Sequence, residues 1–120
     1  MDPEVQKILL KAGKIASQVK HEGAKKLSQP GASFLEVMDH CEKRIKDLGG
    51  QIAWAQMAVN DTAAHFCPTE DDTSVSKEGD VIKVDMGVHI DGYLADNAIT
   101  VIVGSSDEHK DMVKAAQNAL

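Results

Sequence analysis

Aromatic residues and cysteines are scarce in this chain. Its 120 residues include one Trp, one Tyr and two Phe, so a hydrophobic core has to be built from aliphatic side chains and Met. The two cysteines, Cys41 and Cys67, are too few for the disulfide framework that holds small secreted domains together. We therefore expect a cytoplasmic protein whose two thiols are reduced.

Positive charge is also in short supply. Thirteen basic residues stand against nineteen acidic ones, which gives a formal net charge of −6. Nucleic-acid binding requires clustered Lys and Arg side chains that neutralise phosphates, whereas the basic residues here are interspersed with acidic ones. No nucleic-acid partner is therefore expected.

Long apolar runs are missing as well. No stretch approaches the roughly 18 apolar residues that indicate a transmembrane helix, and Met1-Asp2-Pro3-Glu4 lacks the basic and apolar regions of a signal peptide. We expect neither membrane insertion nor secretion. With 42% hydrophobic and 27% charged residues, the composition is that of a single globular domain over residues 1–120.

Two amphipathic helices are predicted in the first fifty residues. Asp2 is a favourable N-cap with Pro3 at the first helical position, and Ser33 with Glu36 forms the capping-box pattern that opens a second helix. Cys41 lies on the apolar stripe of that second helix, where we expect a small core residue. The apolar stripe of the first helix has the spacing of three and four: Val5, Ile8, Leu9, Ala12, Ile15, Ala16 and Val19.

The second half of the chain is predicted to be mainly β-structure. Residues 52–68 show no helical period and are expected to form short strands and loops. Residues 81–85 and 98–103 are β-branched runs on either side of Asp91-Gly92, a hairpin signal. A third helix follows, and three residues are candidates for its cap: Ser105, Ser106 and Asp107. The predicted fold class is α+β.

Two aspartates interrupt the predicted hairpin, although aspartate is depleted in strands. A two-residue turn at Asp91-Gly92 places Asp85 opposite Ala98, and in that register Asp96 lies opposite Gly87. A four-residue loop places Asp85 directly opposite Asp96. Because side chains alternate along a strand, both registers put the two carboxylates on one face, whereas a three-residue loop separates them.

A carboxylate pair on one face needs compensation, because like charges at close range destabilise each other. The pair can share a proton, or it can bind hard divalent cations through its oxygen atoms. A third arrangement leaves one aspartate pointing into solvent, without function. Spacing alone leaves the metal-binding and the structural interpretation open.

The amino-acid sequence of this segment resembles a known metal-binding hairpin. It contains Asp85-Met86-Gly87, then His89-Ile90-Asp91-Gly92-Tyr93, and then Asp96 with Thr100 beyond it. Upstream, Asn60-Asp61-Thr62-Ala63-Ala64-His65-Phe66-Cys67-Pro68 carries a histidine 20 residues before Asp85. Over essentially the whole chain, these motifs resemble the methionine aminopeptidases of the pita-bread metallopeptidase family, in particular the type 2 branch of archaea and eukaryotes.

The resemblance implies the N-terminal half of a pita-bread fold, with residues 105–120 beginning the second half. It implies metal-dependent removal of the initiator methionine from nascent proteins, with two divalent metal ions (Co, Mn, Fe or Zn). Asp85 and Asp96 are then expected to be metal ligands. His65 is expected to be a catalytic and substrate-binding residue that contacts the scissile amide of a peptide beginning with Met.

The resemblance also implies that the site is incomplete. The family adds a histidine and two glutamates from a later part of its chain, so we expect these 120 residues alone to be inactive. We expect an exposed seam through which the chain associates with itself or with a complementing C-terminal half. Two alternatives stay open: a catalytically silent module that acts by protein association, and a proline-specific dipeptidase of the same fold.

One stretch departs from the family pattern. In part of its methionine pocket the family has an aromatic residue followed by proline. The corresponding segment of this chain reads Ala53-Trp54-Ala55, without the proline, and is one residue shorter than in the family. Trp54 is either the wall of an apolar pocket or an anchor of the core.

Overall fold

Helix α1 (Pro3–Leu27) begins at the predicted N-cap. The carboxylate of Asp2 accepts a hydrogen bond from the N–H of Glu4 at 2.7 Å. Helix α2 (Phe34–Asp47) begins after Ser33, whose hydroxyl accepts from the N–H of Glu36 at 3.3 Å. Both predicted helix starts are confirmed in this computed structural model, which describes residues 1–120.

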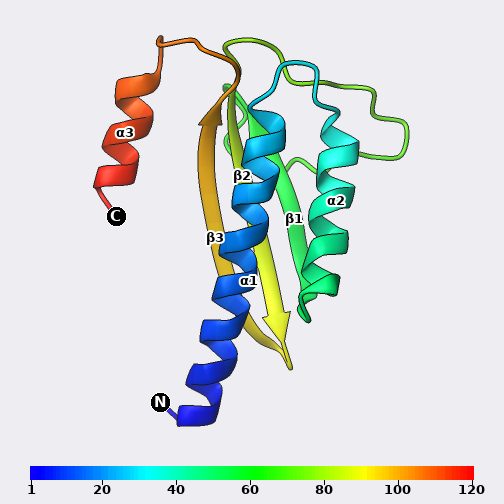
Figure 1. The fold of residues 1–120 in the computed structure, drawn as a ribbon, viewed down its shortest axis with the longest axis vertical. Coiled ribbons are helices and arrows are strands. Elements are labelled where there is room, and N and C mark those ends of the chain that lie inside the picture. Colours follow the sequence, from blue (N-terminus) through cyan, green and yellow to red (C-terminus); the bar gives the residue numbers. More distant parts are fainter.

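Three antiparallel strands follow in the order β1-β2-β3: β1 (Gln51–Val59), β2 (Val81–Ile90) and β3 (Tyr93–Ile102) (Figure 1). The hairpin of β2 and β3 has the two-residue turn, since Ile90 pairs with Tyr93. Both turn residues have positive φ, 53° at Asp91 and 85° at Gly92, as the primed turns that match strand twist require. The predicted alternatives with a four-residue or a three-residue loop are therefore wrong.

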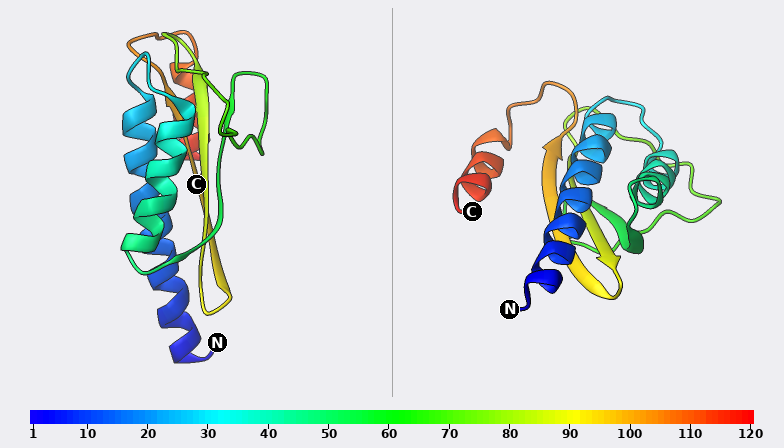
Figure 2. Two further views of the ribbon diagram at one scale, coloured as in Figure 1. Left: turned by 90° about the vertical axis from the view of Figure 1, so that its right-hand side faces the viewer. Right: turned by 60° about the horizontal axis from the view of Figure 1, so that its bottom comes forward.

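The core lies between the sheet and the two long helices. Helices α1 and α2 cover the same face of the sheet (Figure 2), and the side chains between the two layers are almost all aliphatic, as predicted. Cys41 is fully buried among them, and burial raises the pKa of its thiol to about 12. The largest fully buried apolar side chains besides Cys41 are Leu27, Ile45, Met57, Ile82, Met86, Val19, Val84, Val88 and Val103.

Neither α1 nor α2 covers the other face of the sheet, which carries the side chains of Trp54, Lys83, Asp85 and Asp96 and is called the open face below. Residues 60–80, which join β1 to β2, form a long loop on this side (Figure 2). A β-bridge between Met57 and Phe66 ties the loop to β1.

Helix α3 (Lys110–Asn118) stands beside β3 and buries none of its residues (Figure 1). The predicted cap at Ser105, Ser106 or Asp107 is wrong, because the helix begins after His109 without a side-chain cap. Ser105 is engaged elsewhere, since its N–H donates to a carboxylate oxygen of Glu78 at 2.8 Å. None of the three helices combines the length and apolarity that a membrane span requires.

Candidate metal centre

Asp85 and Asp96 lie next to each other on the open face. Asp85 of β2 is paired with Ala98, and Asp96 of β3 is paired with Gly87, so the two aspartates are diagonal neighbours on one face of the ladder. Each stands opposite a residue with little or no side chain, which leaves room for the carboxylates. Of the three registers considered from the sequence, the one with the offset pair is confirmed.

The two carboxyl groups interact directly. Burial, the negative charge of Asp85 and a hydrogen bond with the Asp85 carboxyl raise the pKa of Asp96, and the backbone N–H of Asn97 opposes the shift only in part. A raised pKa is the expected result of two acids at close range without a counter-charge. Asp85 is half-buried, whereas Asp96 is exposed to solvent, so the metal-binding and the structural interpretation of the pair both stay open.

Trp54 of β1 belongs to the same cluster. Its indole Nε1–H donates to Oδ1 of Asp85 at 2.9 Å. The ring lies against Gly87, where an added Cβ would come within 2.4 Å of indole atoms Cδ2 and Cε2. Trp54 is half-buried and is not part of the hydrophobic core, so its interpretation as a core anchor is wrong.

His65 lies at the edge of the open face, in the loop between β1 and β2. Its φ of 69° is a left-handed conformation, which is uncommon for a residue other than glycine. Two hydrogen bonds between the backbones of Met57 and Phe66, at 2.9 and 3.0 Å, fix the next residue to β1. His65 and Asp85 line one cavity of about 140 Å³, together with Met57, Ala58, Ala63, Ala64, Lys83 and Ala98. Asp96 does not line this cavity.

Asn60 and Lys83, which were not expected to be site residues, shape the border of the site. The Asn60 amide donates to Oδ1 of Asp80 at 3.1 Å and accepts the first backbone N–H of β2 at 2.9 Å. Lys83 donates from Nζ to the carbonyl of Asn60 at 2.7 Å, and burial lowers the pKa of its ammonium group. A signal for Lys83 was available, because it precedes Asp85 by two residues and strand alternation places both on one face.

The carboxylate pair has the chemistry of a divalent cation site but not its full ligand set. Oxygen ligands suit hard cations, and a cation would relieve the repulsion that raises the pKa of Asp96. No third His, Cys, Asp or Glu side chain joins Asp85 and Asp96. Two carboxylates are fewer than the roughly six ligands of an octahedral ion.

An antiparallel sheet that presents paired aspartates beside a histidine-bearing loop is compatible with a metallopeptidase. Residues 7–120 match the model of metallopeptidase family M24, and the chain belongs to that family.

Relatives of the chain include named enzymes. It is 48% identical over 121 residues to the methionine aminopeptidase of Archaeoglobus fulgidus, an alignment that covers 100% of this chain and 40% of the relative. The methionine aminopeptidase structure from Thermotoga maritima superposes with a TM-score of 0.90 at 28% identity, over 100% of this chain and 51% of that one. The resemblance to archaeal methionine aminopeptidases that the sequence motifs indicated is therefore confirmed.

The fold prediction is confirmed too. The prolidase of Pyrococcus furiosus has a TM-score of 0.79 at 20% identity, over 98% of this chain and 35% of that chain, which shows that the pita-bread architecture is shared. The chain spans about half or less of the length of each of these proteins.

Proposed function

We propose that residues 1–120 supply the aspartate pair and the catalytic histidine for metal-dependent removal of an N-terminal methionine. The observation that carries the proposal is that Asp85 contacts Asp96 on one side and shares a cavity with His65 on the other. The high identity to a named methionine aminopeptidase supports the choice of reaction.

Asp85 and Asp96 are the proposed ligands of two divalent metal ions, of which Co, Mn, Fe and Zn are the candidates. Bound divalent ions would supply Lewis acidity that polarises an amide carbonyl and activates water. The contribution of the two aspartates is to bring negative charge to one point on a rigid sheet. Their diagonal placement lets both carboxylates face the same ion.

His65 is the proposed contact to the substrate. An exposed imidazole that borders the same cavity as Asp85 can reach an amide held at the carboxylate pair. There it would donate a hydrogen bond or a proton to the leaving nitrogen of the scissile bond. The substrates are peptides or nascent proteins that begin with Met.

The remaining metal ligands have to come from polypeptide outside residues 1–120. Strand β3 has no partner on its outer side, and two open grooves of about 470 and 370 Å³ separate α3 from the sheet. We propose that a complementing half, or a second copy of the chain, adds to this seam, and that residues 105–120 begin the second half. We place the reaction in the cytoplasm, a choice that the free thiols of Cys41 and Cys67 support.

A chimera tests the proposed function. Residues 1–120 replace the aligned part of the Archaeoglobus fulgidus relative, and hydrolysis of a Met-Ala-Ser peptide is assayed with Co²⁺ or Mn²⁺. We expect turnover by the chimera, none by residues 1–120 alone, and none after Asp85→Ala or Asp96→Ala. His65→Ala should lower kcat by about 10²- to 10⁴-fold.

The control for the chimera is Asp71→Ala, because Asp71 is exposed in the loop away from the carboxylate pair. Its kcat should equal that of the parent chimera. An inactive chimera that folds and binds Mn²⁺ would favour the silent module, and cleavage of X-Pro dipeptides in place of Met-Ala-Ser would favour the prolidase-like activity. Intact Asp85, Asp96 and His65 argue against the silent module.

A further inference from the structure

The indole of Trp54 makes the only hydrogen bond that reaches the carboxylate pair from β1. The donor atom Nε1 lies 2.9 Å from Oδ1 of Asp85. An indole N–H only donates, whereas each carboxylate oxygen accepts more than one bond. Oδ1 therefore keeps a free lone pair, so the contact is compatible with cation binding by the same carboxylate.

The ring has little freedom to leave this position. It lies on Gly87, which is the one β2 residue between Asp85 and the turn that leaves space for it, since a Cβ there would be 2.4 Å from the ring. A register irregularity between Ile52 and Trp54 shifts the pairing of β1 just before the ring. Such bulges re-aim side chains, and here the bulge precedes the residue that meets Asp85.

Packing alone does not require tryptophan at this position. Trp54 lies outside the core cluster and is half-buried on the open face, where another apolar ring would cover Gly87 equally well. The N–H is the only hydrogen-bonding group of the indole ring. Gln56 offers a comparison, because it is paired directly with Asp85 but its side chain makes no hydrogen bond to the Asp85 carboxylate.

We propose that Trp54 is a positioning residue of the metal centre, whose indole N–H orients the Asp85 carboxylate toward a divalent cation shared with Asp96. Hydrogen bonds that orient metal-ligating carboxylates typically contribute 10- to 100-fold to metal affinity. The inference rests on the proposed metal site and adds a residue that acts through Asp85 rather than on the metal.

The sharpest test removes the N–H and keeps the ring. Trp54 is the only tryptophan in the chain, so growth of a tryptophan auxotroph on 3-benzothienylalanine replaces it with a ring of the same shape that carries sulfur in place of N–H. Mn²⁺ affinity of the 120-residue chain is measured from the free-ion electron paramagnetic resonance signal. We expect a Kd about tenfold weaker for the substituted chain, with an unchanged melting temperature.

Trp54→Phe provides a second variant without the donor, and it should weaken Mn²⁺ binding to a similar extent. The matched control is Gln56→Leu, which removes a donor beside Asp85 that makes no bond to it, and its Kd should equal that of the wild type. Equal Kd values for the wild type and both Trp54 replacements would overturn the inference and leave the proposed function intact.

A metal-free measurement checks the contact itself. The indole ¹H–¹⁵N resonance of Trp54 should move upfield in Asp85→Asn and stay in place in Asp71→Asn. An indole resonance whose chemical shift is unchanged in Asp85→Asn would contradict the inference. If neither the wild-type chain nor the active-site chimera, which supplies the remaining ligands, bound Mn²⁺ while the indole resonance responded as expected, the proposed metal site and with it the role of Trp54 would be contradicted.

Discussion

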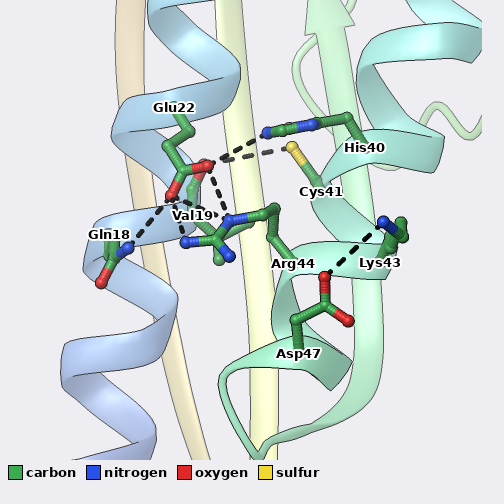
Figure 3. A network of polar contacts seen from close by, with 8 residues as sticks. All are labelled: Gln18, Val19, Glu22, His40, Cys41, Lys43, Arg44 and Asp47. Atoms are coloured by element: carbon green, nitrogen blue, oxygen red, sulfur yellow. Dashed lines mark hydrogen bonds and ion pairs between the residues drawn. The ribbon is translucent and has the colours of Figure 1, made fainter.

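Arg44 of α2 reaches across to Glu22 of α1 and donates to both oxygens of its carboxylate, from Nε to Oε1 at 3.0 Å and from Nη2 to Oε2 at 3.4 Å (Figure 3). Nε2 of His40 lies 3.1 Å from the same Oε1, and the Gln18 amide donates to Oε2 at 3.2 Å. One carboxylate thus collects polar partners from both helices. It joins α1 to α2 above the face of the sheet that these helices cover.

The Glu22 cluster predicts a pH-dependent contribution to stability. Burial opposes ionisation, but the hydrogen bonds from Arg44, His40 and Gln18 outweigh it and lower the pKa of Glu22 below its usual 4.5. A group with a depressed pKa in the folded state stabilises fully above its usual pKa, and this stabilisation is lost as the pH falls through the folded-state value. Glu22→Gln should therefore cost about 1 kcal/mol at neutral pH and progressively less as the pH falls below the usual pKa of 4.5.

Urea denaturation of wild type and Glu22→Gln across this pH range measures the difference. Glu4→Gln is the matched control, because Glu4 and Lys7 form an ion pair with side chains 77% and 74% exposed, and such pairs contribute little. A Glu22→Gln deficit that is equally large at neutral and acidic pH would show that the carboxylate charge is not responsible.

The two confirmed helix caps should differ in their effect on stability. Ser33→Ala removes the acceptor for the Glu36 N–H at the start of α2, where the next residue, Phe34, is buried, and should cost about 1 kcal/mol. Asp2→Ala removes an equivalent acceptor, but the first turn of α1 is exposed and projects beyond the sheet (Figure 1). Because that turn can fray without disturbing the core, Asp2→Ala should lower the free energy of unfolding, measured in urea, clearly less than Ser33→Ala does. Equal losses would contradict the argument.

The two thiols should react at very different rates. Cys41 is fully buried, and burial raises its pKa to about 12, whereas Cys67 is exposed. Because the thiolate is the nucleophile, iodoacetamide at about pH 8 should label Cys67 alone in the native chain. Mass spectrometry after digestion locates the label. In urea both cysteines should react, and prompt labelling of Cys41 without denaturant would contradict its burial.

The elements that were predictable from the sequence depend on local chemistry. The caps at Asp2 and Ser33 and the turn at Asp91-Gly92 each involve residues that are close in the chain. Strand alternation then places Asp85 and Asp96 on one face in two of the three possible registers. The choice between those registers required the structure, because it depends on which turn forms.

The features that were missed depend on contacts between distant residues. Ser105 does not cap α3, because the helix begins only at Lys110, and the N–H and hydroxyl of Ser105 both donate to a carboxylate oxygen of Glu78, 27 positions away. Trp54 meets Asp85 only because β1 is shifted by one residue against β2. No local pattern in a single sequence records such pairings, and the motif resemblance gives residue roles but not the hydrogen bond between these two side chains.

Gly87→Ala should disturb the centre through Trp54. The new Cβ would overlap indole atoms at 2.4 Å, and a ring cannot yield without leaving Asp85. Overpacking of this kind typically costs about 1–3 kcal/mol. We expect lower stability in urea and a red shift of the fluorescence of the only tryptophan, as the ring moves out into solvent.

Gly13→Ala is the opposite case and controls for the substitution itself. Gly13 lies within α1, and nothing would stand within 4 Å of a Cβ there, so alanine should stabilise the helix by about 1 kcal/mol. The emission of Trp54 should not change in this variant, because the substitution lies on another element. If Gly87→Ala instead kept the wild-type emission and stability, the ring would not be held against Gly87, and the geometry that directs its N–H to Asp85 would have to be abandoned.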